Sequence, residues 1–235
     1  MRKIGLFLTI AILIANPIVG RSEENSDAYI WLDVHTIYNF SDRWRYEGDY
    51  GYRPELNGDQ ASVYIRPAFR YKATPWFNLH GGIKFKDTVS ADAADTFEIR
   101  PWQGFQLVWP KIGGYTVSHY LRVAERMIWQ TRGGSDFDFT LRARYKLGLK
   151  SPNYDILFKS GMYLTGNIEA FANLESPLSD TFINRLRFFA GPGLNVSDAW
   201  RIELLLGLQQ ERGSRAADFS TDEQILRLRF YYTFN

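Results

Sequence analysis

The sequence contains no cysteine, only three histidines, and no run of five or six like charges. The missing cysteines exclude disulfides, thiolate metal sites, a cysteine nucleophile and a lipidated N-terminal cysteine. The scattered charges, with a net charge of +2, argue against a nucleic-acid-binding arm. Beyond the N-terminus, no segment is apolar enough for a transmembrane helix. The sequence therefore excludes a helical membrane protein and thiol chemistry.

The N-terminus has the pattern of an export signal. Met1-Arg2-Lys3 carries two positive charges ahead of an apolar run from Ile4 to Ala15. This run is shorter than the ~20 residues that span a bilayer as a helix, which favours a secretory signal over an uncleaved anchor. Small residues allow cleavage after Gly20 or after Ser22. We predict a signal peptide over 1–22 and a single domain over 23–235.

Alternation with a period of two residues runs through the rest of the chain. In segment 44–54, Trp44, Tyr46 and Tyr50 share one parity, while Arg45 and Glu47 share the other. A β-strand turns such residues to opposite faces. The same pattern predicts eleven strands, at about 27–40, 44–54, 61–72, 76–87, 96–109, 115–129, 137–147, 154–166, 182–195, 200–211 and 223–234. An awkward phase at Glu125-Arg126 predicts a β-bulge there.

These strands, behind an export signal, predict an all-β fold: a transmembrane, antiparallel, up-and-down β-barrel. Bacterial single-chain barrels have even strand numbers, so we expect about 12 strands, with 10 as the alternative. The mean hydropathy of −0.30 suits a barrel, because only alternate residues meet lipid. A soluble, lipocalin-like barrel stays open, since parity alone does not distinguish inside from outside.

The predicted connections alternate between short turns and longer loops. The longer loops lie near 55–60, 88–95, 130–136, 167–181 and 212–222. Short periplasmic turns and longer external loops are typical of outer-membrane barrels. An aromatic residue lies beside each short turn, and rings at one end of successive hairpins would form an interfacial girdle. These residues are Trp44, Trp76, Trp109, Tyr154 and Trp200.

The parity that places aromatic residues outside places charged residues in the lumen, and arginine predominates there. The predicted lumen-lining basic residues are Arg45, Arg53, Arg66, Arg70, Arg100, Arg122, Arg126, Arg142, Arg144, Arg185, Arg187, Arg201, Arg227 and Arg229, with lysines such as Lys84, Lys86 and Lys146. The predicted acidic ones are Asp33, Glu47, Asp49, Glu98 and Glu203. An excess of cations in a narrow barrel requires water or bound anions. The lumen is either a narrow anion-preferring pore or a plugged, structural interior.

The final segment, 225–235, resembles the C-terminal assembly signal of outer-membrane proteins, although Asn235 follows the aromatic Phe234. The wider chain resembles the Gram-negative family called domain of unknown function 2490. This resemblance rests on Trp31, on the Ser-Asp-x-Trp turn at 41–44, and on segments 98–103, 122–126 and 184–185. It implies an outer-membrane barrel, in contact with outer-membrane lipids and assembled by the barrel-assembly machinery, without an assigned activity. Small anionic solutes are candidate ligands, and no nucleic acid is expected.

Catalytic motifs are scarce. Ser118 and His119 are adjacent, so a strand turns them to opposite faces. Asp33 and His35 share a face near Glu47 and Asp49, for which a buried polar network is the simpler interpretation. Loop aspartates such as Asp92 are better read as solvated than as ligands. We therefore expect no catalytic residue, no metal and no cofactor. The alternatives are a lipid- or peptide-processing enzyme and a barrel that binds partners through its loops.

Overall fold

The computed structural model describes residues 26–132, 136–154, 161–174 and 181–234. The predicted signal peptide, with both cleavage positions, lies outside the described residues. No helix in the described part of the chain is long and apolar enough to cross a membrane. The described elements are twelve strands: β1 (Asp27–Asn39), β2 (Trp44–Pro54), β3 (Gln60–Arg66), β4 (Ala68–Lys72), β5 (Phe77–Ser90), β6 (Thr96–Val108), β7 (Thr116–Gln130), β8 (Phe137–Lys150), β9 (Met162–Asn173), β10 (Ile183–Asn195), β11 (Trp200–Glu211) and β12 (Ser220–Phe234).

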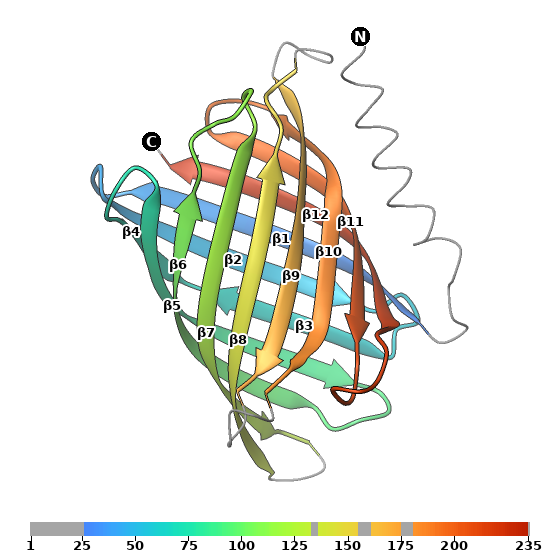
Figure 1. Cartoon of the computed structure of the whole chain (residues 1–235). Coiled ribbons are helices and arrows are strands. Elements are labelled where there is room, and N and C mark those ends of the chain that lie inside the picture. The colour runs from blue at the N-terminus through green and yellow to red at the C-terminus, as the bar shows by residue number, and fades with distance from the viewer. Residues whose placement is uncertain (1–25, 133–135, 155–160, 175–180, 235) are drawn as a thin grey trace.

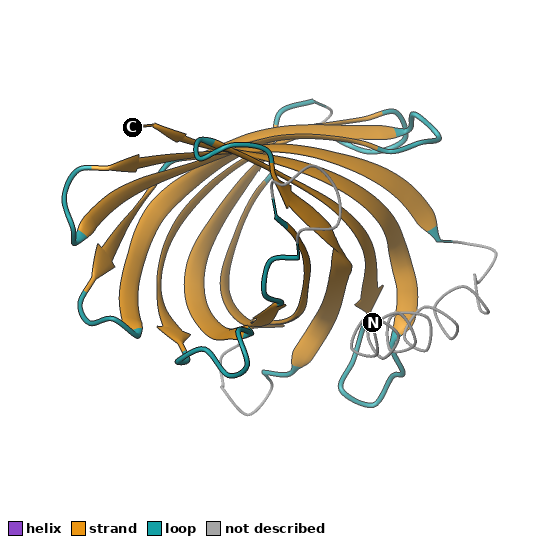
Figure 2. Ribbon diagram, turned by 90° about the horizontal axis from the view of Figure 1, so that it is seen from above, coloured by secondary structure: helices purple, strands orange, loops and turns teal. Residues whose placement is uncertain are grey.

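The strands form one closed barrel, confirming the predicted fold class (Figures 1 and 2). Strands β3 and β4 both pair with β2 and β5, so they occupy one position in the wall. Pro67 separates them, because proline has no N–H to donate to the ladder. Its carbonyl still accepts a hydrogen bond from the Ile83 amide (3.1 Å). Twelve strands with one shared position give eleven positions around the wall.

The odd number of positions explains how the barrel closes. Successive strands alternate in direction, so the first and the eleventh position of an up-and-down barrel run the same way. Accordingly β1 and β12 pair in parallel, from Asp27 opposite Glu223 to Tyr38 opposite Phe234. The other neighbouring pairs are antiparallel. The twelve strands match the expected number, but the expectation of an even barrel does not hold for the wall.

Two local predictions were wrong. The segment at 154–166 was placed too early: β9 covers Met162–Asn173, so residues 167–173 of the loop expected at 167–181 belong to this strand. The bulge expected at Glu125-Arg126 is absent, because β7 keeps regular register with β8 through both residues. Register shifts occur instead between Ile183 and Arg185 and between Gln209 and Gln210.

Three short turns share one construction that explains their sequence. The Ser41 side chain accepts a hydrogen bond from the Trp44 amide (3.1 Å), and Ser197 accepts one from the Trp200 amide (3.1 Å). Thr74 accepts one in the same way from the Phe77 amide (3.0 Å). Such side chains satisfy amides that a tight turn leaves unpaired. These turns place the aromatic residues beside them at one end of the barrel.

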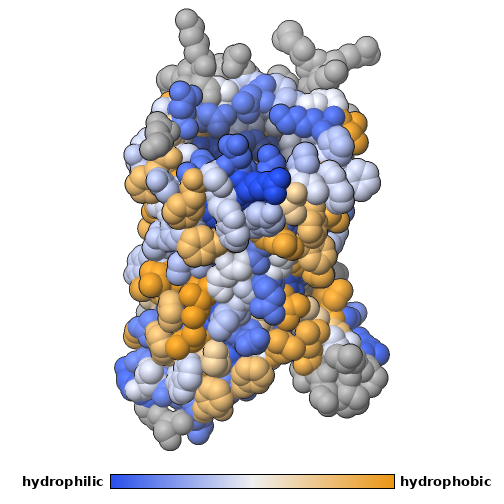
Figure 3. All heavy atoms as spheres, turned by 90° about the vertical axis from the view of Figure 1, so that its left-hand side faces the viewer, coloured by the Kyte–Doolittle hydropathy of each residue, from blue (hydrophilic) through white to orange (hydrophobic). Residues whose placement is uncertain are grey.

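The two faces of the wall differ sharply in chemistry. Large apolar side chains point outward and are exposed; Leu206 is 69% exposed and Val63 is 51% exposed. Charged side chains point inward and are buried; Asp33 is 0% and Asp49 is 2% exposed. On the face shown in Figure 3, hydrophobic residues gather over the middle and lower parts, and hydrophilic residues gather toward the top. The fold thus buries charge and exposes hydrocarbon.

Candidate functional site: the basic lumen

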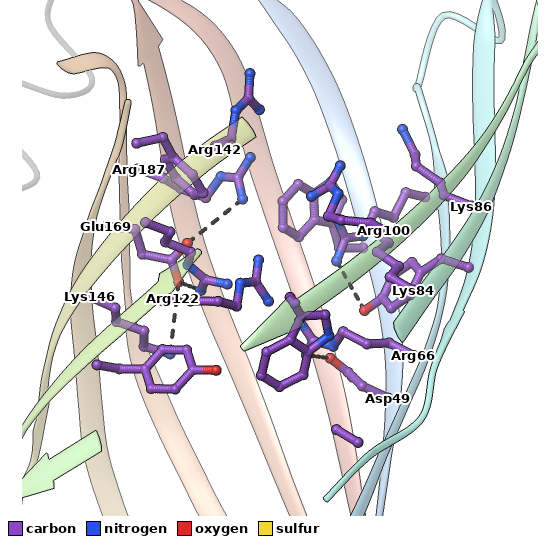
Figure 4. Close-up of a pocket in the computed structure, with 18 of the residues that line it drawn as sticks. Asp49, Arg66, Lys84, Lys86, Arg100, Arg122, Arg142, Lys146, Glu169 and Arg187 are labelled. Carbon is purple, nitrogen blue, oxygen red and sulfur yellow. Dashed lines mark hydrogen bonds and ion pairs between the residues drawn. The ribbon is translucent and has the colours of Figure 1, made fainter. Parts of the chain in front are cut away.

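A cavity of about 370 Å³ lies inside the barrel and is lined by charged residues from most of the strands (Figure 4). Of the predicted acidic residues, Glu47, Asp49 and Glu98 line it. Among the predicted basic residues, the structure places these along the cavity: Arg53, Arg66, Arg100, Arg122, Arg126, Arg142, Arg144, Arg185, Arg187, Arg227 and Arg229. The cavity is thus the place where the inward-facing charges meet.

Asp33 anchors the parallel seam between β1 and β12. Its carboxylate accepts hydrogen bonds from Arg227 (2.6 Å) on β12 and from the Tyr64 hydroxyl (2.8 Å) on β3. Arg53 on β2 lies 3.5 Å away. A fully buried carboxylate is stable only when it is paired and hydrogen-bonded. Asp33 meets this requirement with partners from three other strands.

Asp49 forms a second buried centre beside the first. Arg66 donates a short hydrogen bond to it, and Arg229 on β12 lies 3.3 Å away. His35 lies 4.0 Å from the same carboxylate, and its Nδ1 is 3.5 Å from Arg229. The predicted grouping of acids and a histidine therefore exists. Its arginine partners make it an ion-pair network that ties β1, β2, β3 and β12 together.

The sequence reasoning missed Glu169, which is 2% exposed on β9. Arg144 donates a short hydrogen bond to it, while Lys146 and Arg187 each lie 3.8 Å away. It was missed because 167–181 was interpreted as a loop. The alternation from Tyr163 to Phe171 would have revealed it, since Glu169 shares the parity of both residues.

The other predicted residues have simpler partners. Glu98 accepts hydrogen bonds from Arg100 (2.6 Å) and Arg126 (2.7 Å). Glu203 accepts one from each of two buried tyrosine hydroxyls, of Tyr163 and Tyr231, both at 2.7 Å. Two further arginines donate hydrogen bonds to asparagines, Arg45 to Asn39 and Arg142 to Asn173. Three others form ion pairs: Arg70 with Glu47, Arg185 with Glu211, and Arg201 with Glu203.

Arg122 and Lys84 differ from these residues, because neither forms an ion pair with any described carboxylate. Both are buried, at 7% and 9% exposed. Arg122 is directly opposite Arg144, and Lys84 is directly opposite Arg100. Like charges at such positions repel one another. Both cations contact aromatic faces: Lys84 lies 4.2 Å from the Tyr64 ring and Arg122 lies 5.2 Å from the Trp102 ring.

Catalytic groups do not converge in the described part of the chain. Ser118 lines the cavity, whereas His119 lies on the outer face with its Nδ1 2.6 Å from the Tyr145 hydroxyl. This adjacent pair is therefore divided by the barrel wall. Within the described ranges, no group of three or more acidic or histidine residues could hold a metal ion.

The predicted girdle residues lie together at the short-turn end. Trp44, Trp76, Trp109 and Trp200 are each between 43% and 55% exposed. Trp44 and Trp200 contact outward tyrosines of the next strand, Tyr71 and Tyr232, at ring distances of 5.0 and 4.7 Å. Tyr154 is half-buried and lies 3.4 Å from Tyr115 through the two hydroxyls.

The fold and its lumen define a closed β-barrel of inverted polarity, apolar outside and charged inside. Residues 28–220 match the family described as protein of unknown function, DUF2490, and the chain belongs to this family. This confirms the resemblance drawn from the sequence. No curated protein matches the chain.

Proposed function

We propose that the protein is an outer-membrane β-barrel that forms a narrow, anion-preferring pore and has no enzymatic activity. The polarity of the wall supports this proposal most strongly. A soluble barrel carries apolar residues inside and polar residues outside. A barrel in lipid has the reverse arrangement. This barrel has it too, with Leu206 on the outer face and Asp33 on the inner face.

The aromatic residues at the short-turn end support the same orientation. Tryptophan and tyrosine rings favour the boundary between lipid and water. We therefore assign the short-turn end to the periplasm and the opposite end to the cell exterior. The predicted signal peptide would direct export, and β12, which ends at Phe234, would be the strand that the barrel-assembly machinery recognises.

The balance of charge in the lumen supports selectivity for anions. Lys84, Lys86 and Arg122 face the cavity without a described carboxylate partner. Eleven wall positions lie between the eight-stranded barrels that side chains fill and the sixteen-stranded barrels that hold an aqueous channel. An inward apolar cluster of Trp31, Phe189 and Leu205 narrows the interior further. Together these features favour a narrow passage for small anions.

Planar-bilayer recording of the refolded protein under a salt gradient tests the proposal. We expect discrete conductance steps with a reversal potential on the anion side. Arg142→Glu should shift this potential toward cation selectivity, because Arg142 faces the cavity and its hydrogen bond goes to the neutral Asn173. Arg43→Glu, with the same charge change on an exposed turn, should leave it unchanged. A folded, inserted protein that never conducts would overturn the pore and leave a closed structural barrel.

A further inference from the structure

We propose that Arg122, Trp102 and Lys84 form a binding site for a phosphate- or sulfate-type oxyanion inside the lumen. The inference deepens the proposed function, since it rests on the same basic lumen, but it concerns binding and not conduction. The three side chains line one cavity (Figure 4 labels Arg122 and Lys84).

The strand register brings the three residues together. Trp102 on β6 is directly opposite Gly82 on β5 and Ala124 on β7. Lys84 and Arg122 are each two residues from one of these partners, so they flank Trp102 as diagonal neighbours on either side. Diagonal neighbours on one face are about 7–8 Å apart, within reach of long side chains. The small residues Ala68 and Ala124 pack against the indole.

Two members of the site, Trp102 and Arg122, have a buried donor without a described hydrogen-bond partner. Trp102 is 6% exposed, and its Nε1 has no hydrogen-bond partner among the described residues. The Nε of Arg122 also lacks one, as does the Nε of Arg144 directly opposite. Buried donors without partners are costly, and native proteins satisfy nearly all of them. These donors are therefore free to bind water or a ligand that accepts hydrogen bonds.

The chemistry of the donors selects the class of ligand. Guanidinium, ammonium and indole N–H groups donate hydrogen bonds and accept none. Arginine forks match the paired oxygens of a tetrahedral oxyanion. The acids nearest to the site do not compete, because Glu98 is occupied by Arg100 and Arg126, and Glu169 by Arg144. A multiply charged anion that only accepts hydrogen bonds fits this set best.

Calorimetric titration of the refolded full-length protein with inorganic phosphate tests the site. We expect saturable binding that is weakened by about tenfold or more in Arg122→Gln, since a charge-assisted bidentate contact is lost. Trp102→Phe keeps the ring and removes only the N–H, so it should weaken binding by a smaller factor. Arg45→Gln is the matched control, because Arg45 lies outside the cavity lining and donates to Asn39. Unchanged phosphate affinity in both Arg122→Gln and Trp102→Phe would overturn the proposal.

Thermal unfolding without and with phosphate gives a second readout. Phosphate should raise the melting temperature of the wild type and not that of Arg122→Gln, because a ligand stabilises only the form that binds it. Without phosphate, Arg122→Gln should be at least as stable as the wild type. A large loss of stability in that variant would contradict the idea of an unpartnered cation, and Trp102→Phe would then still test binding.

The experiments separate the site from the pore. Phosphate binding without conductance would support the site and overturn the pore. Conductance without saturable phosphate binding would support the pore and overturn the site. Glycerol 3-phosphate, titrated in parallel, distinguishes a free oxyanion from a lipid headgroup. Saturable binding of this ligand alone would move the assignment to a headgroup and overturn the free anion.

Discussion

Two sides of the lumen carry similar cations but differ in their acids. On the seam side, formed by β11, β12, β1 and β2, Asp33, Asp49 and Glu203 are each held by several partners. On the basic side, formed by β5 to β8, Glu98 is the buried acid, and no described carboxylate pairs with Lys84 or Arg122. The seam joins the first and last strands, β1 and β12, in parallel. Ion pairs across these strands add to the hydrogen bonds of the backbone ladder. The basic side leaves charge available for solutes.

Breaking the seam side should have the largest effect. Asp33→Asn would leave the buried Arg227 and the half-buried Arg53 without their carboxylate, which costs about 3–5 kcal/mol of unfolding free energy. Urea unfolding of the refolded protein would measure the loss. Asp138→Asn on β8 is the control, because Asp138 is exposed and its hydrogen bond among the described residues is with the Thr140 hydroxyl. Equal stability of both variants would show that the seam network does not hold the barrel closed.

Crowding the seam side should have a smaller effect. A Cβ at Gly51 would come within 2.2 Å of the Tyr64 ring and 2.4 Å of the Asp33 carboxylate. Gly51→Ala should therefore reduce the unfolding free energy by about 1–3 kcal/mol, as overpacking does. At Gly81 on β5, the nearest atom to an added Cβ is 3.9 Å away, so Gly81→Ala should be nearly neutral. Urea midpoints of the two variants that coincide would refute the close packing around Asp33.

Neutralising the basic side should have the smallest effect, and in the opposite direction. Lys84→Met removes a buried charge without a carboxylate partner, so the unfolding free energy should stay the same or rise by up to about 1 kcal/mol. Lys146→Met is the matched comparison, because Lys146 lies 3.8 Å from Glu169. It should destabilise the barrel more than Lys84→Met does. A larger loss in Lys84→Met would mean that Lys84 has a stabilising role that its contacts do not account for.

The faces of the strands could be predicted from the sequence because a strand has a strict period of two. Arg142 and Arg144 face inward, and Phe137 and Phe139 outward, as their parity requires. The turns were also predictable, since Ser41 and Ser197 precede an aromatic strand start. Such features depend only on near neighbours in the sequence.

Features that depend on distant residues could not be predicted. Asp33 and Arg227 are separated by 194 positions, and parity does not say which inward arginine meets which acid. The parallel seam follows from the total number of wall positions, which a missed or split strand changes. Glu169 was lost for a local reason, because an error in one strand boundary turned a buried acid into a loop residue.

The most direct test of the central claim, that lipid surrounds the outer face, is fluorescence quenching of single-tryptophan variants by brominated lipids. One variant keeps Trp200, which is 43% exposed, and the other keeps Trp102, which is 6% exposed and faces the cavity. Our account predicts strong quenching of Trp200 by lipids brominated near the headgroup, and none of Trp102 at any depth. Quenching of Trp102 but not of Trp200 would contradict the assigned faces, and quenching of neither would contradict insertion in the membrane.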